Sequence, residues 1–448
     1  MTNATPYPLE GPRMNTNLAE EATTYLFPLY EMARMRAATS PRRIASGAAG
    51  DSPESPQRWC NVFIHARQLL SSGKSRVVTP NNDTLYTNAW LDLRHGPLVI
   101  DVPDTAGRYY VLGLLDMFTN PFASVGSRTT GTQARSFLVT PPGWTGEIPA
   151  AFQAEGAHIA SPTHWVWIIG RILIDGEHEL DTVHAVQDGF VMRGLDGAGP
   201  RRFDPGFSPQ HLGQGQPDAQ QFAKVVNAEL VDTPTPSTQR ELVASFAALG
   251  LGAGRGRLSV GQASQIEQTL ASCIARWRGS DIGKRSESSW QSMPVLGKSF
   301  GTDYARRAIV ALKYIGALES LDAYYPMAYA DSSGQTLNGQ HRYSIRFAAG
   351  AFPPVDSFWS ITLYSSADFM LVPNPIDRFA MGDRTPGLHY EPDGALCIHI
   401  AHVPPTDATA RANWLPACEG DFYLCLRAYV PRASMLDGSY VLPAVERI

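Results

Sequence analysis

The chain has 448 residues, which is long enough for two or three domains, each with its own hydrophobic core. Its net charge is −5 and its 37 lysines and arginines are scattered, so the basic face that nucleic-acid binding requires is not predicted. The 39 glycines and 34 prolines indicate many turns, which mainly β architectures need.

The cysteines and the hydropathy pattern bear on where the protein resides. The five cysteines form an odd set without CxxC spacing, so neither a disulfide framework nor a zinc knuckle is predicted. The first residues, MTNATPYPLEGPRMN, lack a basic segment followed by an apolar one, so no secretory signal is predicted. No stretch approaches the roughly 20 apolar residues of a spanning helix. We therefore expect a cytoplasmic protein that binds no membrane.

Helical periodicity dominates the first 75 residues. Leu18, Ala22, Tyr25 and Leu29 recur at steps of three and four, which predicts a helix over about 17–35 that Pro28 kinks or divides. Residues 40–56 are rich in Ser, Pro, Gly and Ala and are expected to form a loop. A second short helix is predicted over 59–70. Residues 1–75 are thus expected to be N-terminal helices that pack on a first β domain.

Strand patterns replace the helical period over residues 76–195, which are expected to form that first β-rich domain. Residues 84–92 alternate between two faces, as a strand does. Residues 108–115 and 164–172 are apolar on both faces, which predicts central strands. Turn residues separate such runs at spacings of about ten, the pattern of a β-sandwich or barrel.

The remaining chain divides into a helical segment and a second β-rich domain. Residues 196–335 contain three helical stripes, among them Ile266, Leu270, Ile274 and Trp277. Residues 336–448 alternate again, for example over 358–364, 395–403 and 422–430. The sequence therefore predicts a mainly β, mixed α+β fold in which two β domains bracket a helical insert.

Familiar catalytic and cofactor motifs are missing from the sequence. There is no complete P-loop, HExxH, EF-hand loop or GxSxG elbow, so no cofactor is predicted. His399 and His402 are three apart in an expected strand and point to opposite faces, which disfavours a shared metal. A metal held by residues distant in the sequence would leave no local motif.

The first of three polar clusters precedes the strand at 84–92. It contains Asn81 and Asp83, followed by Tyr86 within the strand. Sites are often built at such strand ends, so Asp83 is a candidate general acid or base, Tyr86 a candidate proton donor and Asn81 a substrate-binding residue. Alternatively, the segment is an Asx turn that only stabilises a loop.

The second cluster follows the apolar strand at 108–115. Asp116 ends that strand, where burial and an arginine partner would tune its pKa, so it is a third candidate catalytic residue. Arg128 lies shortly after it and is a candidate for holding an anionic group. The alternative is a structural ion pair between Asp116 and Arg128.

The third cluster lies in the C-terminal β-rich segment. Asn374, Arg378 and Arg384 surround expected turns, and Trp414 follows further along. The two arginines could clamp a carboxylate or phosphate with paired hydrogen bonds. They could equally satisfy neighbouring aspartates or loop carbonyls. Asn374, Arg384 and Trp414 are therefore candidate substrate-binding residues.

These segments resemble the tandem DUF1254/DUF1214 family. The N-terminal motifs are PNNDTLYTNAWLDL, VPDTAGRYYVLGLLDMFTNPFASVGSRTTGT and WIIGRILIDG; the C-terminal motifs include FWSITLYSSADFMLVPNPIDRFAMGDRT, GLHYEPDGALCIHI and NWLPA. The resemblance implies two β-sandwich, jelly-roll-like domains with helices between them, and it implies no activity. The family motifs match at Asn81, Asp83, Thr84, Tyr86, Asp116, Arg128, Asn374, Arg384 and Trp414.

The chain departs from the family pattern in three places. It begins without the export or lipoprotein signal of many relatives, which weakens a periplasmic assignment. Cys418 stands where the family pattern after NWLPA continues with Pro, and Asn82 replaces a more common charged residue. Changes beside the candidate site segments suggest a specialised substrate.

Three functions fit these residues. The first is a cofactor-independent enzyme, a hydrolase or lyase, that acts on a small organic molecule by general acid–base chemistry between or at the mouth of the β domains. The second is a non-catalytic protein that binds a carbohydrate or other small ligand on aromatic residues (Trp90, Trp359, Trp414). The third is a structural or assembly role, and a homo-oligomer is compatible with each.

Overall fold

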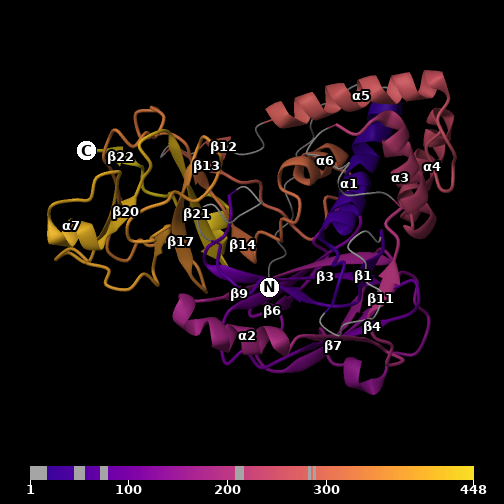
Figure 1. The fold of residues 1–448 in the computed structure, drawn as a ribbon, viewed down its shortest axis with the longest axis horizontal. Helices are drawn as coiled ribbons and strands as arrows, with labels where there is room; N and C mark the ends of the chain where they lie inside the picture. The colour runs from indigo at the N-terminus through magenta and orange to yellow at the C-terminus, as the bar shows by residue number, and fades with distance from the viewer. Residues whose placement is uncertain (1–17, 45–55, 71–78, 207–215, 281–283, 286–288) are drawn as a thin grey trace.

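The computed structural model describes residues 18–44, 56–70, 79–206, 216–280, 284–285 and 289–448. Within these ranges the chain folds into two β-sandwiches and a layer of helices (Figure 1). This arrangement confirms the predicted mixed α+β fold. The expectations for the first 15 residues and for most of the loop at 40–56 fall outside the described residues.

The first sandwich consists of two sheets that bury a common core. One sheet has the order β2-β3-β9-β5-β6 and the other β10-β4-β7-β8. Side chains such as Leu85, Ile168, Ile100 and Phe137 fill the space between them. The strand bounds are β2 Ile64–His65, β3 Thr84–Asp92, β4 Leu98–Val102, β5 Tyr110–Leu115, β6 Ala123–Gly126, β7 Arg135–Thr140, β8 His158–Ala160, β9 Trp165–Leu173 and β10 Val191–Gly194.

The strands predicted in this half are confirmed. β3 occupies the residues expected to alternate, and β9 lies between β3 and β5 at the centre of its sheet. The run at 108–115 forms β5, and all six of its residues are buried. Helix α2 (Leu180–Asp188) follows the central strand β9 in the chain.

One prediction near the start of the chain is wrong. The second helix expected over 59–70 is replaced by β1 (Arg58–Cys60), which pairs with β11 (Arg201–Phe203), and by β2. Asn61 between them has a positive φ of 58°, which a helix interior does not accommodate. Pairing with distant strands overrides the helical spacing of the apolar residues here, as tertiary context commonly does.

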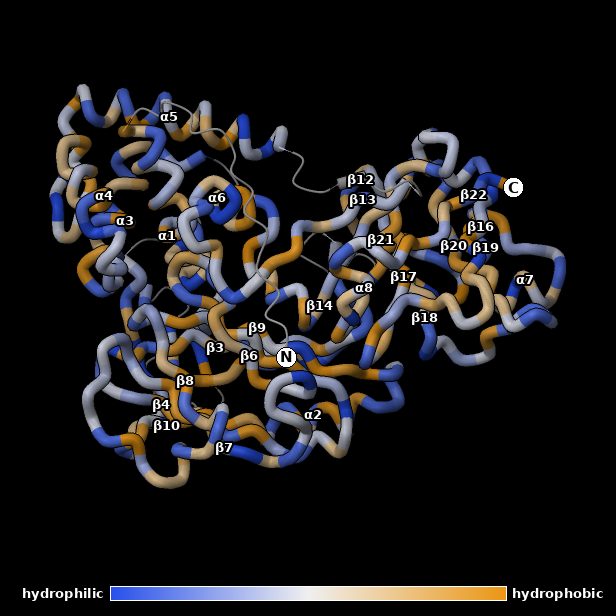
Figure 2. The backbone as a smooth tube through the Cα atoms, turned by 180° about the vertical axis from the view of Figure 1, so that it is seen from behind, coloured by the Kyte–Doolittle hydropathy of each residue, from blue (hydrophilic) through white to orange (hydrophobic). Residues whose placement is uncertain are grey.

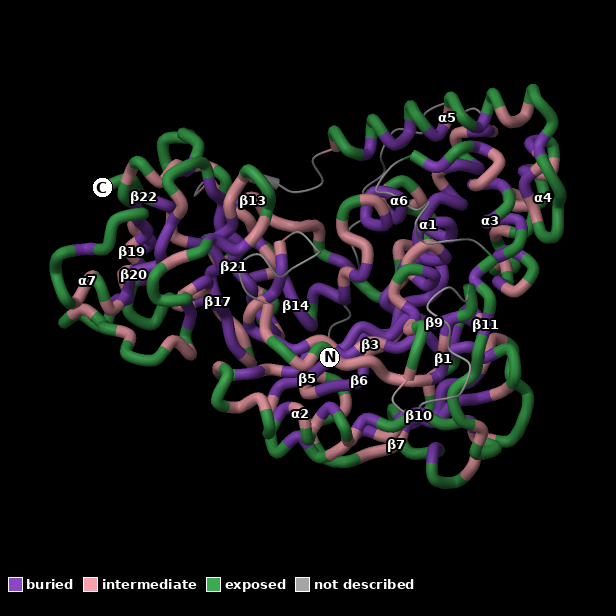
Figure 3. The backbone as a smooth tube through the Cα atoms, viewed as in Figure 1, coloured by how far each residue is buried: buried purple, intermediate pink, exposed green. Residues whose placement is uncertain are grey.

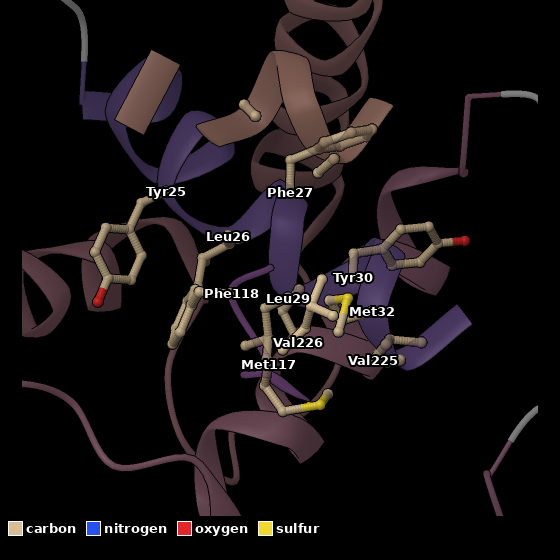
Figure 4. Close-up of a cluster of buried hydrophobic side chains, with 14 of the residues drawn as sticks. Tyr25, Leu26, Phe27, Leu29, Tyr30, Met32, Met117, Phe118, Val225 and Val226 are labelled. Atoms are coloured by element: carbon tan, nitrogen blue, oxygen red, sulfur yellow. The ribbon is translucent and has the colours of Figure 1, made fainter. Parts of the chain in front are cut away.

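A helical layer covers the free face of the sheet that contains β3 and β9. Its members are α1 Leu18–Thr39, α3 Ala219–Asp232, α4 Arg240–Ser245, α5 Val260–Gly279 and α6 Tyr304–Lys313. Helix α1 is the centre of this layer and continues through Pro28, so the proline does not divide it. Figure 4 shows its side chains Tyr25, Phe27 and Met32 among those of α3 and of the segment after β5.

The long helix α5 lies on the outside of this layer. Its predicted stripe is confirmed, because Ile266, Leu270, Ile274 and Trp277 are all buried. Its opposite face is exposed and polar (Figures 2 and 3). The helix begins at a capping box in which Ser259 and Gln262 satisfy each other's backbone N–H groups.

The second sandwich pairs the sheet β12-β13-β15-β21-β17-β18, with β14 also on β21, against the sheet β20-β19-β16-β22. Leu424, Leu426, Ile345 and Ile398 belong to the core between them. The bounds are β12 Lys284–Arg285, β13 Trp290–Ser292, β14 Ala323–Tyr324, β15 Met327–Ala328, β16 Tyr343–Phe347, β17 Trp359–Ser365, β18 Ala380–Gly382, β19 Leu396–Ala401, β20 Trp414–Pro416, β21 Phe422–Tyr429 and β22 Glu446–Arg447, with helices α7 Ala408–Ala412 and α8 Ala433–Leu436.

The first strands of this sandwich lie within residues 196–335, which were expected to be helical. Strands β12 to β15 have two or three residues each, too few to produce a period in the sequence. The longer strands β17, β19 and β21 coincide with predicted runs. Among the described residues, no helix combines the length and apolar character needed to cross a membrane.

The helical layer depends on contacts between aromatic side chains of α1 and α5. Phe27 is 1% exposed, and its ring centroid lies 5.0 Å from that of Trp277. We predict that Phe27→Ala lowers the free energy of unfolding by about 3–5 kcal/mol, because it removes the ring and leaves a cavity. Chemical denaturation measures this change. Val260→Ala, at an 89% exposed position, should alter stability by no more than about 0.5 kcal/mol, and equal losses in both variants would contradict the prediction.

Candidate functional site

Polar faces of the two sandwiches meet between them. Strand β21 directs Arg427 and Tyr429 away from the second core, because its alternate residues fill that core. On the first sandwich, Tyr86 of β3 pairs in register with Arg171 of β9, and both lie on the face opposite the first core. These four side chains are the centre of the interface.

The segment just before β3 attaches the first half of the chain to the second sandwich. Two backbone groups of Thr79 form hydrogen bonds with that sandwich. Thr79 N donates to Phe369 O at 2.8 Å, and Thr79 O accepts from Arg427 Nη2 at 3.0 Å. The next carbonyl, Pro80 O, accepts from Tyr364 Oη at 2.7 Å. The position of the following residues is therefore fixed by both sandwiches.

Asn81 forms the predicted Asx turn. Its Oδ1 accepts from Asp83 N at 2.7 Å, and its Nδ2 donates to Thr84 Oγ1 at 3.0 Å and to Tyr429 Oη at 2.8 Å. The turn therefore has the structural role expected of it. It also aims the Asp83 side chain at the second sandwich, so the same geometry builds a site.

Asp83 is 6% exposed and contacts two residues that are distant in the sequence. Its Oδ2 accepts from Ser360 Oγ at 2.7 Å, and its Oδ1 accepts from Arg384 Nη2 at 3.1 Å. Arg384 also pairs with Asp175 and lies over the Phe358 ring, 4.1 Å from its centroid. The structure thus brings together two predicted site residues, Asp83 and Arg384, that are 301 positions apart.

A pocket of about 420 Å³ opens beside Asp83. Residues 82–83 and 174–176 of the first half line it, together with residues 359–360, 376–382 and 384–386 of the second. Its volume is within the usual range of small-ligand sites. Because both halves contribute walls, the pocket exists only when the sandwiches are docked.

A second carboxyl group lies next to this pocket. Asp383 Oδ1 accepts a hydrogen bond from Trp359 N at 3.2 Å. Asp383 as a whole residue is exposed, but its carboxylate is turned toward the backbone of Trp359. Desolvation of this group raises the pKa of Asp383 to about 6, and the negative charge of Asp83 adds to the rise. The pKa of Asp383 is therefore close to neutral pH, where a carboxyl group can exchange protons efficiently.

Two buried arginines lie deeper between the sandwiches. Arg171 is 7% exposed with its guanidinium 5.4 Å from the Tyr86 ring centroid, and Arg427 is 5% exposed and 5.0 Å from the Tyr325 ring. Burial alone would raise the pKa of Tyr86, but the two guanidiniums outweigh it and lower that pKa below its usual value of 10. The charges of both arginines therefore act on one tyrosine hydroxyl.

Asp116 lies far from this interface. Its carboxylate accepts from Phe118 N at 2.8 Å, Asn120 N at 2.9 Å and Asn120 Nδ2 at 2.8 Å, and burial raises its pKa. Asp83 lies beside Ile174, whereas the strand before Asp116 ends opposite Trp167, so roughly 23 Å of β9 separates the two carboxylates. The structure does not bring these two candidate acids together.

Arg128 forms structural ion pairs, and its partner is not Asp116. Its Nη2 donates to Glu319 at 2.8 Å and its Nε to Asp322 at 2.7 Å. Both carboxylates precede strand β14. Arg128 therefore joins the first sandwich to the segment that enters the second one.

The predicted tryptophans and Asn374 are mostly buried or hydrogen-bonded within the fold. Trp90 is 3% exposed and stacks on Trp167, with ring centroids 5.3 Å apart. Trp414 is also 3% exposed, and its indole N–H donates to a backbone carbonyl. Asn374 closes a turn through Arg378 O. Among the three tryptophans considered for ligand stacking, Trp359 lines the pocket.

Arg171, Arg427, Tyr325 and Ser360 were not among the site residues predicted from the sequence. The two arginines carry a usable signal, because each is the one charged residue in an otherwise apolar strand (WVWIIGRIL and FYLCLRAY). A strand that is apolar on both faces is expected to be buried, so a charged residue within it is expected to be buried as well. Ser360 carries no comparable signal, since its role arises from the docking of Asp83.

Other parts of the described chain offer less chemistry. A pocket of about 630 Å³ lies beside α3, and its walls are Asp218, Gln220, Gln221, Lys224, Ala228 and residues 254–257. No group of three His, Cys, Asp or Glu side chains within the described ranges is arranged to hold a metal ion. The five cysteines are free thiols. The interface between the sandwiches is therefore the candidate site.

Two β-sandwiches that share one interface, together with a helical layer that α1 and the later helices α3 to α6 form, define the class of this protein. The model "Protein of unknown function (DUF1254)" matches residues 60–194, and "Protein of unknown function (DUF1214)" matches residues 322–433. The chain belongs to the tandem DUF1254/DUF1214 family, as its motifs predict. The two matched ranges supply both walls of the pocket beside Asp83.

A solved structure resembles nearly the whole chain. The VPA0106 protein from Vibrio parahaemolyticus superimposes with a TM-score of 0.71 at 25% identity, covering 96% of this chain and 99% of that one. A putative uncharacterized protein from Burkholderia cenocepacia covers 98% of this chain and 91% of its own, at 14% identity and a TM-score of 0.42. No curated protein matches the sequence. The first likeness shows that the two-sandwich fold recurs in another protein.

Gly382 permits the close approach of two strands at the pocket wall. A Cβ atom there would lie 1.9 Å from Trp359 O and 2.8 Å from Ser360 Cα, and backbone atoms cannot move aside cheaply. We predict that Gly382→Ala lowers the free energy of unfolding by about 1–3 kcal/mol, as overpacking does. Denaturant titration measures the loss. Gly420→Ala, which meets no atom within 4 Å, is the control, and equal stability of both variants would refute this account.

The raised pKa of Asp383 makes stability depend on pH. Because the folded-state pKa is about 6 and the ordinary value is 3.8, the folded chain binds more protons between these values, and its stability falls as pH rises through this window. We predict that Asp383→Asn, which cannot ionise, removes this part of the slope. Unfolding measured from pH 4 to pH 7 tests it; parallel curves for variant and wild type would contradict the assignment.

Proposed function

We propose that the protein is a cofactor-independent enzyme of the hydrolase or lyase type, which acts on a small organic molecule by general acid–base chemistry in the pocket between the sandwiches. The observation that supports this proposal is the Asp83 carboxylate. It is buried, it is held by Ser360 and Arg384 of the other half, and it borders a pocket of about 420 Å³.

Asp83 is the proposed general base. A carboxylate offers about four lone-pair positions, and Ser360 and Arg384 use two of them, which leaves acceptor capacity for a substrate proton. Ser360 orients the carboxylate, and it can pass its own proton to Asp83 as it takes one from the substrate. Asp383, with a pKa of about 6, is the proposed acid that returns a proton to the leaving group.

Arg384 supplies positive charge beside these groups. Its guanidinium lies between Asp83 and Asp175 and is supported from below by the Phe358 ring. Such a fixed cation stabilises negative charge that develops on a reacting oxygen, especially where water is excluded. Tyr86 lies deeper, and its lowered pKa suits it to proton transfer with the inner part of a bound molecule.

The alternative function, non-catalytic binding of a carbohydrate, has less support. Carbohydrate binding on stacked aromatic rings needs exposed ring faces, whereas Trp90, Trp414 and Trp359 are each 3% exposed. We also propose a cytoplasmic location, which the five free thiols support because reducing compartments keep cysteines in this form.

The proposal predicts that substrate turnover depends on Asp83. The full chain is incubated with pooled small esters, lactones and β-hydroxy acids, and their consumption is followed by mass spectrometry. Asp83→Asn should lower the rate on any consumed compound by about 10²–10⁴-fold, because the base is lost. Ser360→Ala keeps the carboxylate and should lower it about tenfold, the effect of one lost hydrogen bond.

Asp356→Asn is the matched control, because Asp356 is an exposed aspartate that pairs with Arg432 outside the pocket. It should leave the rate unchanged. Wild-type rates in both Asp83→Asn and Ser360→Ala would refute the proposed chemistry. A compound that stabilises the wild type and Asp83→Asn equally without being consumed would instead favour the binding function.

A further inference from the structure

We propose that Arg171 and Arg427 form a binding site for the carboxylate of an aromatic organic acid, buried between the two sandwiches. This inference deepens the proposed function, since it names the class of molecule that enters the same interface. Binding of the acid does not require the proposed reaction, and the inference rests on the proposed function only for what happens to the acid after it has bound. Its basis is a pair of buried guanidiniums that form no ion pair with any described residue.

Both arginines are held by the centres of their sheets. Arg171 lies on β9, where the register places it opposite Tyr86 on one side and Val111 on the other. Arg427 lies on β21 opposite Ser360 of β17. A residue flanked by hydrogen-bonded strands on both sides cannot move toward solvent without breaking the sheet. The two positive charges therefore stay fixed in the interface.

Neither arginine is neutralised by the fold. Among the residues that the structure describes, no carboxylate lies within ion-pair distance of Arg171 or Arg427. Nε and Nη1 of Arg171 and Nε of Arg427 are shielded from solvent and have no hydrogen-bond partner in the described part of the chain. An unpaired buried charge is strongly unfavourable, so these donors indicate an anion that is not part of the described chain.

Other arginines of this chain show the usual solution. The buried Arg36 pairs with Glu229, and the partly buried Arg128 pairs with two carboxylates. Arg307 of α6 is 3% exposed and has Asp116 as a source of negative charge nearby. Arg171 and Arg427 differ from these three, because no carboxylate of the described ranges is among the main charges that act on them.

The surroundings of the pair favour a flat aromatic body behind the carboxylate. The guanidiniums lie near the rings of Tyr86 and Tyr325, and both of these tyrosines remain partly exposed. Next to them, the rings of Phe358 and Tyr429 stack with centroids 4.1 Å apart. Rings of this kind pack favourably against another ring, while the planar guanidiniums match the two oxygens of a carboxylate.

Tyr325 adds an uncommitted donor to this site. Its Oη is shielded from solvent and has no hydrogen-bond partner among the described residues. A buried hydroxyl ordinarily finds a partner, so a ligand oxygen would satisfy it. Asp83 is linked to Tyr429 through the hydrogen bonds of Asn81, and its carboxylate is already paired with Arg384.

Binding of benzoate to the full chain tests the inference. Isothermal titration and thermal unfolding should show saturable binding of benzoate, and binding of its neutral analogue benzamide should be at least about tenfold weaker, because a charge-assisted hydrogen bond is lost. Arg171→Met and Arg427→Met should each weaken benzoate binding by about tenfold or more. Tyr325→Phe, a mild change that keeps the ring, should weaken it about threefold to tenfold.

Arg307→Met is the matched control, since it removes a buried arginine under aromatic rings in the helical layer. It should lower stability without changing benzoate affinity at a temperature where the variant is folded. Arg171→Lys keeps the charge and should retain part of the benzoate affinity. Its binding would show that Arg171→Met loses affinity because the charge is missing and not because the protein is misfolded.

The inference is overturned if benzoate does not bind, or if it binds Arg171→Met and Arg427→Met as tightly as the wild type. Sulfate that binds as tightly as benzoate would show an inorganic-anion site and overturn the assigned class. Asp83→Asn separates this inference from the proposed function. Benzoate binding with wild-type turnover in Asp83→Asn refutes the acid–base proposal alone, whereas lost turnover in Asp83→Asn without any benzoate binding refutes this inference alone.

Discussion

The attachment of residues 79–83 to the second sandwich is the interaction on which the rest of the structure depends. Thr79, Pro80, Asn81 and Asp83 each form a hydrogen bond with that sandwich, to Phe369 and Arg427, Tyr364, Tyr429 and Ser360 respectively. The segment leads directly into β3, so these bonds set the distance between two sheets. The pocket, the buried arginines and the position of Asp83 all follow from that distance.

Each sandwich has a hydrophobic core of its own, and this explains why their shared interface can be polar. Strand β21 illustrates the division, because Leu424 and Leu426 belong to the second core while Arg427 and Tyr429 face the first sandwich. Stability comes mainly from the two cores and the helical layer. The interface is therefore free to hold charged and hydroxyl groups whose burial would be unfavourable in a core.

Most of the fold and part of the candidate site could be predicted from the sequence, for physical reasons that differ between segments. Strands such as 84–92 and 422–429 impose a strict two-residue alternation, which is visible without any partner. The helix predicted over residues 59–70 is absent, because strand pairing with β11 and β3 outweighs the helical spacing of the apolar residues. Asp83 and Arg384 were recognised separately, but their contact depends on docking across 301 positions. Asp116 looked equivalent to Asp83, since a sequence does not reveal which end of a sheet a side chain occupies.

The long chain separation of the docking contacts also bears on the order in which the molecule assembles. Asp83 and Ser360 are 277 positions apart, and Thr79 and Arg427 are 348 apart, whereas neighbouring strands inside each sandwich are much closer in the chain. Closing a longer loop costs more conformational entropy and slows folding, so each sandwich forms before the two dock. The docked interface is then the last part to form and the first to open. A molecule bound at this interface stabilises the docked state of the two sandwiches, because it shifts the equilibrium away from the state in which they are apart.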